Sequence, residues 1–288
     1  MNTRLFKIAT FAALSCIGAT LAHAHRVWIL PSMTVLSGTD QWVSVEAAVS
    51  NNLFFPNHRP VNLAQVQVTA PDGSPVELKN ATGGQIRSSF ELHLEKQGTY
   101  VISLRPGGRG GPGGPGGPGG QQGSLMGTWE ENGKVQRWRG TPETLVSENM
   151  AAKPGFKLRS SGGRRVFAFV TCGAPTTENL KPTGKDLELE FITHPTDLVA
   201  GEPSTFRVLL DGKPVAGAEV AIVRGDDRFR NDAGEITLHT DAEGLVKIDW
   251  PVAGRYWMEV TASVLDELHG VPHEKSFVYI ATLEALPL

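Results

Sequence analysis

Apolar and polar side chains alternate residue by residue along many short stretches of this chain. In Trp42–Ala47, the two valines fall on one side of an extended backbone, and the serine and the glutamate fall on the other. A period of two is that of a β-strand, and no long segment has the 3.6-residue period of a helix. The alternation recurs later in the chain, for example at 65–70, 90–94, 206–210, 218–222 and 246–250. The pattern predicts an all-β protein.

Turn sequences separate the alternating stretches at intervals of about ten residues. Pro71–Ser74 and Asp241–Gly244 each contain a glycine, which tolerates a positive φ angle. Short, half-buried strands at this spacing are typical of a β-sandwich. A polar stretch at Pro175–Lys185 separates two sets of such strands. We therefore expect two β-sandwich domains, residues 25–183 and 184–288, and the second has the size of an immunoglobulin-like module.

The stretch Gly107–Gly120 contains only glycine, proline and Arg109. It has no side chains with which to build a core, and it lacks the lysine and the following helix of a phosphate-binding loop. We expect a disordered Gly/Pro-rich loop inside the first domain, because the entropy cost of closing a loop rises slowly with its length. Beyond it, Thr141 and Pro142 predict the start of one short helix, and Arg164–Val170 is expected to return as a strand.

The first 24 residues have the pattern of an export signal. Arg4 and Lys7 precede an apolar run, and Ala22-His23-Ala24 is a small-x-small cleavage site. Cleavage after Ala24 would place the chain in the periplasm or outside the cell with His25 at its N-terminus, and cleavage after Ala22 is the alternative. The net charge of −3 and the 40% share of hydrophobic residues argue against a nucleic-acid partner and against a multispan membrane protein. After cleavage, we expect no segment to insert directly into a membrane.

The common sequence signatures of enzymes are missing. The chain has no G-x-S-x-G, H-E-x-x-H or C-x-x-C motif. Cys172 is the one cysteine beyond the signal segment, and no neighbour in the sequence suggests an activating base. The acidic residues between Asp226 and Glu235 lack the spacing of a calcium loop, so we expect a solvated acidic loop there. The sequence therefore favours a binding protein over an enzyme.

A histidine at a free N-terminus offers a metal two nitrogen donors, its α-amine and its imidazole. For His25, a second imidazole would complete a planar three-nitrogen set, which suits Cu(II) or Ni(II). His58 is the favoured second ligand, because Phe54–Pro60 is a proline-bounded loop of the kind that often carries binding residues. The other cleavage site would give the terminus His23-Ala24-His25, which also suits these metals. Alternatively, His25 merely opens the first strand.

Three further histidines are candidate metal ligands. His194 follows a predicted strand, and His269 and His273 have a spacing that would align them on one helical turn. Gly270 and Pro272 lie between the last two, however, and favour a loop there.

Several motifs resemble those of a bacterial secreted family of unknown function. They are the start His25–Ser32, the segments Leu187–Pro195 and Leu198–Glu202, and the turns and strands at 210–220, 240–244 and 254–257. The family is commonly described, by analogy, as a periplasmic component of nickel or cobalt uptake. The resemblance implies an immunoglobulin-like or carboxypeptidase-regulatory-like second domain. It also implies that His25 matches a characteristic histidine after the signal peptide and that His194 lies within a family motif.

The leading functional prediction is a non-enzymatic periplasmic protein that binds a nickel, cobalt or copper ion and assists its uptake with a membrane transporter or receptor. One alternative is an interaction module that binds a protein or a glycan without metal. Another is a copper oxygenase that acts on polysaccharide through an N-terminal histidine. That enzyme would need a flat aromatic surface around His25, whereas the apolar neighbours of Trp28 predict a buried ring.

Overall fold

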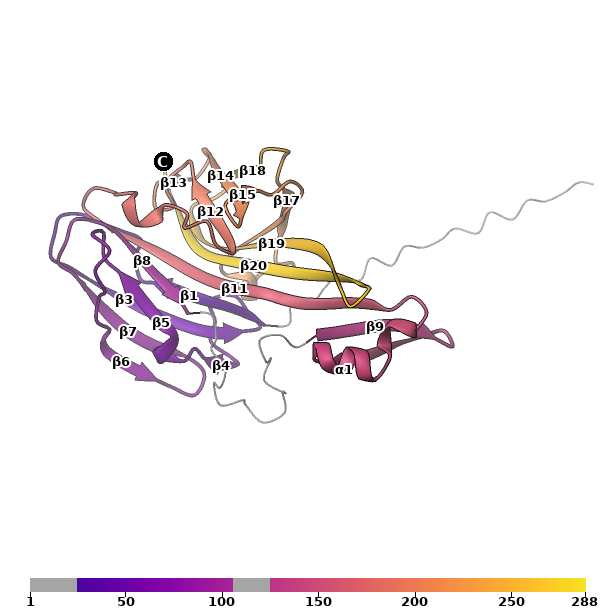
Figure 1. Ribbon diagram of the computed structural model, residues 1–288. Helices are drawn as coiled ribbons and strands as arrows, with labels where there is room; N and C mark the ends of the chain where they lie inside the picture. Colours follow the sequence, from indigo (N-terminus) through magenta and orange to yellow (C-terminus); the bar gives the residue numbers. More distant parts are fainter. Residues whose placement is uncertain (1–24, 106–124) are drawn as a thin grey trace, which may run out of the picture.

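Three β-sheets form the fold in the computed structural model, which describes residues 25–105 and 125–288 (Figure 1). The all-β prediction is confirmed, and the sheets pack as β-sandwiches. The predicted signal segment 1–24 and the loop Gly107–Gly120 lie outside the described residues. Among the described residues, no helix is long and apolar enough to cross a membrane.

The strands divide unequally among the sheets. The first sheet contains β1 (Arg26–Pro31), β3 (Gln41–Ser50), β7 (Ser88–Leu94), β6 (Lys79–Gly83) and β4 (Arg59–Pro60). The large sheet contains β10 (Lys134–Gly140), β9 (Leu125–Glu131), β11 (Lys157–Cys172), β20 (Val271–Leu286), β19 (Gly254–Leu268), β16 (Glu219–Arg224), β17 (Ile236–His239), β2 (Val35–Leu36), β5 (Val66–Thr69), β8 (Gly98–Leu104) and β13 (Leu198–Val199). The third sheet contains β12 (Leu187–Phe191), β14 (Pro203–Leu210), β15 (Lys213–Pro214) and β18 (Leu245–Asp249).

Within residues 25–105 and 125–288, helical structure is confined to one short α-helix and a few 3-10 turns. The α-helix α1 (Pro142–Ser147) starts after Thr141, whose side chain accepts a hydrogen bond from the Thr144 backbone, so the predicted helix start is confirmed. The 3-10 turns are η1 (Leu63–Gln65), η2 (Met150–Ala152), η3 (Glu178–Leu180) and η4 (Asp227–Phe229).

The large sheet lies between the two others and is apolar on both faces. Along β11, Val166 and Ala168 belong to a core shared with the first sheet, whereas Phe169 belongs to a core shared with the third. The same division occurs on β20, where Ile280 faces the first core and Ala281 the second. Because successive side chains of a strand point to opposite faces, one sheet serves two cores.

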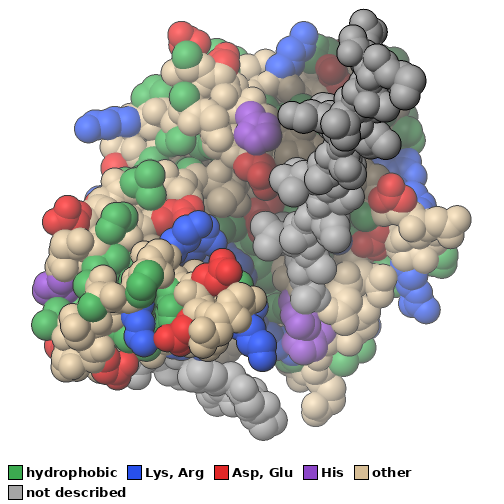
Figure 2. Space-filling view, turned by 90° about the vertical axis from the view of Figure 1, so that its right-hand side faces the viewer, with side chains coloured by type: hydrophobic (Ala, Val, Ile, Leu, Met, Phe, Trp, Pro, Cys, Tyr) green, Lys and Arg blue, Asp and Glu red, His purple; other side chains and the backbone are tan. Residues whose placement is uncertain are grey.

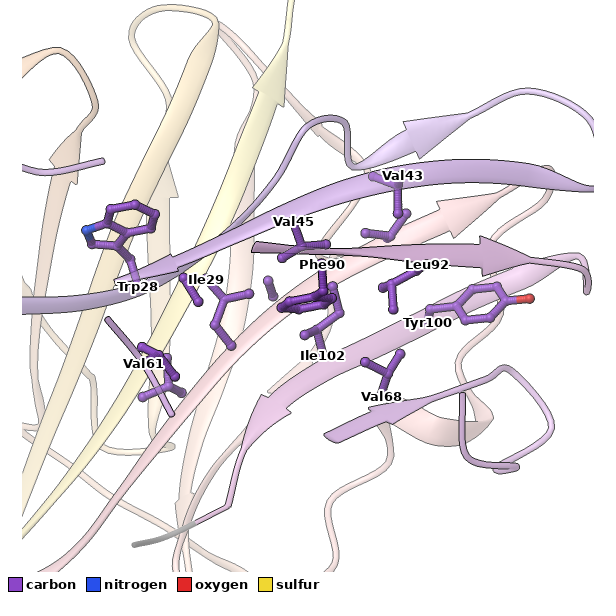
Figure 3. Close-up of a cluster of buried hydrophobic side chains, with 14 of the residues drawn as sticks. Trp28, Ile29, Val43, Val45, Val61, Val68, Phe90, Leu92, Tyr100 and Ile102 are labelled. Atoms are coloured by element: carbon purple, nitrogen blue, oxygen red, sulfur yellow. The ribbon is translucent and has the colours of Figure 1, made fainter. Parts of the chain in front are cut away.

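The first core packs β1, β3 and β7 against the large sheet (Figure 3). Trp28 is fully buried, and its indole Nε1 donates a hydrogen bond of 2.7 Å to Ser50 Oγ. Phe90 and Ile102 point into the same space from β7 and β8 (Figure 3). The prediction that Trp28 is buried is confirmed, so its ring forms no exposed aromatic surface around His25.

Strands from both halves of the chain meet in the large sheet. β11 pairs in parallel with β20, and Val223 and Trp257 from the second half are buried in the first core. The predicted ranges 25–183 and 184–288 therefore share one sheet and exchange core residues. The strand predicted at Arg164–Val170 is the centre of the longer β11, whose pairing with β20 shifts register between Ser161 and Gly163.

A small third cluster lies at the far end of the long strands. It packs β9, β10 and α1 against the ends of β11 and β20, and Figure 1 shows β9 and α1 below the ends of these long strands. Leu125, Leu145 and Leu158 form its centre. This unit is separate from the two larger cores.

Candidate functional site

The register of the first sheet brings His25 and His58 together. Strands β1 and β4 both pair with β3, on opposite edges, with Arg26 opposite Ser50 and Arg59 opposite Val49. His25 precedes β1 and His58 precedes β4, so both side chains stand at the same end of β3. Their ring centroids are 4.1 Å apart, and the ring planes are inclined by 34°. The favoured ligand pair of the sequence analysis is thus a contact pair in the structure.

Hydrogen bonds hold the loop that carries His58. The Asn57 side chain accepts a bond of 2.9 Å from the backbone nitrogen of Asn51 and donates one of 2.8 Å to the side chain of Asn52. Ser50 Oγ donates to the backbone oxygen of Asn52 over 2.7 Å. These bonds tie the end of the loop next to His58 back to its start, where it leaves β3.

Both histidines of this pair are exposed, and no hydrogen bond or ion pair to another described residue engages their rings. Imidazole nitrogens in this state are available to a ligand. The part of the chain that the structure describes holds no cluster of three or more histidine, cysteine or carboxylate side chains able to bind a metal ion. The pair therefore offers two imidazole donors to a metal ion.

A largely buried ion pair involves Arg26, the residue that follows His25. Arg26 contacts Asp227 at 3.5 Å and Glu235 at 3.4 Å, and its guanidinium lies over the Trp257 ring, 5.3 Å from the centroid. The side chains of Arg26 and Asp227 are only 11% and 7% exposed. The prediction of a solvated acidic loop is therefore wrong for Asp227. Its partner is 201 residues away in the sequence, so local spacing does not reveal the pair.

His194 lies in a different environment, at the junction of β8 and β11. Its Nε2 lies 3.2 Å from the backbone oxygen of Thr176 and 3.1 Å from Thr99 Oγ1. Its Nδ1 lies 3.3 Å from the backbone nitrogen of Thr196, which donates to it. Burial lowers the pKa of this imidazole below its ordinary value. Both nitrogens are engaged by protein groups, as in a neutral ring that supports the structure.

His194 also lies apart from the exposed pair. It contacts the region of Thr171, which pairs with Val35 beyond the far end of β1 from His25. Figure 2 shows histidine side chains at separate places on one face of the molecule, with acidic and basic side chains interspersed between them. The structure brings together His25 and His58 and leaves the other candidates elsewhere.

The remaining candidates, His269 and His273, lie in the β19–β20 hairpin. His269 and Gly270 both have positive φ angles, 51° and 77°, and form a two-residue turn. His269 is exposed there. His273 lies in β20 and is buried, so the expected loop is confined to the turn itself. The two rings are therefore in unlike environments.

His273 bridges two side chains on neighbouring strands. Its Nε2 lies 2.7 Å from Ser160 Oγ, and its Nδ1 lies 2.7 Å from Asp266 Oδ1. The order Ser–His–Asp is that of a hydrolase triad, but the burial is reversed. Ser160 is 8% exposed, whereas the Asp266 carboxylate, which a triad buries, is 54% exposed. The arrangement favours a structural bridge that ties β11, β20 and β19 together.

The family model described as Domain of unknown function (DUF4198) matches residues 22–264. The chain belongs to the DUF4198 family. The match begins before His25 and ends within β19, so it includes strands of all three sheets but not β20. The resemblance to a family of unknown function is thereby confirmed, whereas its link to nickel or cobalt uptake stays a prediction. A comparison with curated proteins gives no match to this DUF4198 chain.

Solved structures with some likeness to the DUF4198 chain are remote. The D0-D1 domain of intimin is 12% identical, with 90% of this chain and 97% of that chain covered and a TM-score of 0.19. A DUF4785 family protein from Legionella pneumophila is 9% identical, with coverages of 82% and 52% and a TM-score of 0.24. An ICAM-5 D1-D4 ectodomain fragment is also 9% identical, with coverages of 91% and 51% and a TM-score of 0.21. The chain spans about half the length of the last two. TM-scores this low support no conclusion about function.

Proposed function

We propose that this chain, once processed to begin at His25, is a periplasmic or secreted protein that binds a copper, nickel or cobalt ion and assists its uptake or handling. The ligands are the α-amine and imidazole of His25 and the imidazole of His58. A membrane transporter or receptor is the proposed recipient of the metal. The observation that carries the proposal is the contact between the two exposed rings, with centroids 4.1 Å apart.

The distance between the rings suits a shared metal ion. Metal–imidazole bonds are about 2.0–2.1 Å long, so two nitrogens bound to one ion lie at most about 4.2 Å apart. The His25 and His58 ring centroids are 4.1 Å apart, and we expect rotation of the two exposed side chains to bring one nitrogen of each ring within reach of a shared ion. A set of three nitrogen donors favours Cu(II) and Ni(II), and Cu(II) is the tightest binder among the common divalent ions.

The third donor would arise only on removal of residues 1–24. Cleavage after Ala24 converts the backbone nitrogen of His25 into an α-amine, which with its own imidazole forms a chelate. An α-amine has an ordinary pKa of about 7.7–8.0 and must lose its proton to bind. Metal affinity is therefore expected to fall as the pH drops from 8 to 6.

A Cu(II) titration of the processed protein tests this proposal. The protein that begins at His25 is compared with the same protein acetylated at its α-amine, which can then no longer bind the metal and leaves only the two imidazoles. We expect the affinity, measured by competition with a chelator, to fall about tenfold or more, equal to about 1.4 kcal/mol or more. Equal affinity of the two forms would refute chelation by the α-amine.

A second candidate function is an interaction module that binds a protein or a glycan without metal. The observation that favours it is an exposed aromatic group next to the same loop. Phe229 is 75% exposed and packs edge-on against Phe55, with ring centroids 5.5 Å apart, while the Arg228 guanidinium lies over the Phe55 ring. Aromatic and arginine side chains are enriched at binding surfaces. A Phe229→Ala variant that keeps full Cu(II) affinity but loses a partner captured by the metal-free protein would support this alternative.

A further inference from the structure

A carboxylate from a loop of the large sheet packs against the loop that carries His58. Asp227 belongs to the connection between β16 and β17, whereas His25 and His58 belong to the first sheet. Both Asp227 oxygens lie 3.0 Å from the backbone nitrogen of Leu53, which donates to them. The Arg26 guanidinium lies 3.5 Å from the same carboxylate. Asp227 therefore contacts both chain segments that carry the histidine pair.

The contacts of Asp227 lie close to each histidine along the chain. Arg26 is the residue after His25. Leu53, fully buried, stands in the loop that ends in His58, and the bonds of Asn57 tie the two ends of that loop together. A short, hydrogen-bonded segment therefore connects Asp227 with His58.

The backbone after Leu53 is strained and needs support. Phe54 has a φ of 61°, a conformation that is unfavourable for a bulky side chain. Its ring packs edge-on against Trp28 and lies over Gly225, where an added Cβ would come within 3.0 Å of the ring. The connection between β16 and β17 therefore supports the loop at two points, through the surface of Gly225 and the carboxylate of Asp227.

We propose that Asp227 is a positioning residue of the metal site, which holds the His58 imidazole next to His25 by anchoring Leu53. This inference rests on the proposed function, since it assumes that His58 is a ligand. Asp227 does not bind the metal ion itself and acts through His58 alone. A loop of the large sheet thereby controls a site whose ligands lie at the end of the first sheet.

A double-mutant cycle on the full processed chain tests the inference with Cu(II) as the probe. Asp227→Ala is expected to weaken Cu(II) affinity about tenfold, the loss typical of supporting residues around a metal, and to change the electron paramagnetic resonance spectrum from three nitrogen donors to two. His58→Ala is expected to give the same two-nitrogen spectrum. Because Asp227 acts through His58, adding Asp227→Ala to His58→Ala should cause no further loss of affinity.

Glu235→Ala is the matched control. Glu235 contacts the same Arg26 at 3.4 Å but makes no hydrogen bond to the His58 loop, and its side chain is more exposed. The control variant should keep wild-type affinity and the three-nitrogen spectrum. Asp227→Asn, which retains an acceptor for the Leu53 nitrogen, is expected to fall between wild type and Asp227→Ala. Asp227→Asn replaces Asp227→Ala in the double-mutant cycle if the alanine variant does not fold.

Hydrogen exchange of the metal-free protein tests the contact between Asp227 and Leu53 independently of metal binding. Hydrogen exchange of the Leu53 amide should be faster in Asp227→Ala than in Glu235→Ala. A wild-type affinity that His58→Ala leaves unchanged would refute the proposed function, and with it the inference. If His58→Ala lowers the Cu(II) affinity but Asp227→Ala does not, the inference about Asp227 is overturned and the proposed function stands. If Asp227→Ala lowers the Cu(II) affinity just as much when His58 is already alanine, the inference is also overturned. Asp227 would then support the general stability of the protein rather than the position of His58.

Discussion

His25 and His194 show two opposite uses of the same side chain. The imidazole of His25 is exposed and meets another histidine, and no other described residue engages its nitrogens. The imidazole of His194 is half-buried, and threonine and backbone groups occupy both of its nitrogens. Histidine content alone is therefore a poor guide to a metal site. What matters is whether the fold has already used the nitrogens.

The largest expected effect concerns the exposed pair. His25→Ala in the processed chain should reduce Cu(II) affinity about 100-fold or more, equal to about 2.8 kcal/mol, because it removes one donor and the chelate ring. The free energy of unfolding of the metal-free protein should change by less than about 0.5 kcal/mol, since the side chain is exposed. Chelator competition and urea unfolding measure the two quantities. A large loss of stability would place His25 in the same class as His194.

The reverse result is expected for the buried histidine. His194→Ala should lower the free energy of unfolding by about 1–3 kcal/mol, because it leaves buried hydrogen-bonding groups without partners. Its Cu(II) affinity should equal that of wild type. The control is His239→Ala, at an exposed position of β17, which should change neither quantity. Reduced Cu(II) affinity of folded His194→Ala would contradict the assignment of this residue to structure.

The pH dependence of stability gives a further test of the structural role of His194. Burial lowers the pKa of His194 in the folded state below its ordinary value of 6.5. The unfolded chain then binds a proton more readily than the folded one, so the contribution of His194 is complete above about pH 6.5 and is lost as the pH falls below it. Urea unfolding between pH 7.5 and 5 should show a smaller loss of stability in His194→Gln than in wild type. Parallel curves for the two proteins would show that His194 is not the titrating group.

The smallest effect is expected in the β19–β20 hairpin. Asp266→Asn should lower the free energy of unfolding by less than about 1 kcal/mol, because the carboxylate is 54% exposed and the asparagine side-chain oxygen can still accept a hydrogen bond from His273. Ser160 should also remain unlabelled by a fluorophosphonate probe, which reacts with activated serines. Labelling that disappears in Asp266→Asn would instead identify a working catalytic triad.

Local patterns in the sequence were sufficient to predict the strands and to select His25 and His58 as a pair. The period of two identified β3 and β5, and the proline-bounded loop pointed to His58. The sharing of one sheet by two cores was not predictable, because alternation shows that a strand has two faces but not what covers each. Asp227 was missed for a similar reason. Its acidic neighbours suggested solvent exposure, and Arg26, its partner, lies 201 residues away.

The middle sheet also determines how the molecule can come apart. Neighbouring side chains such as Ala168 and Phe169 belong to different cores, so loosening β11 weakens both sandwiches at once. A fragment of residues 184–288 would expose the edge of β20 that β11 covers, and open strand edges of this kind pair with other chains. The protein should therefore unfold in a single cooperative step, and cleavage in the described connection 175–185 should not release either sandwich intact.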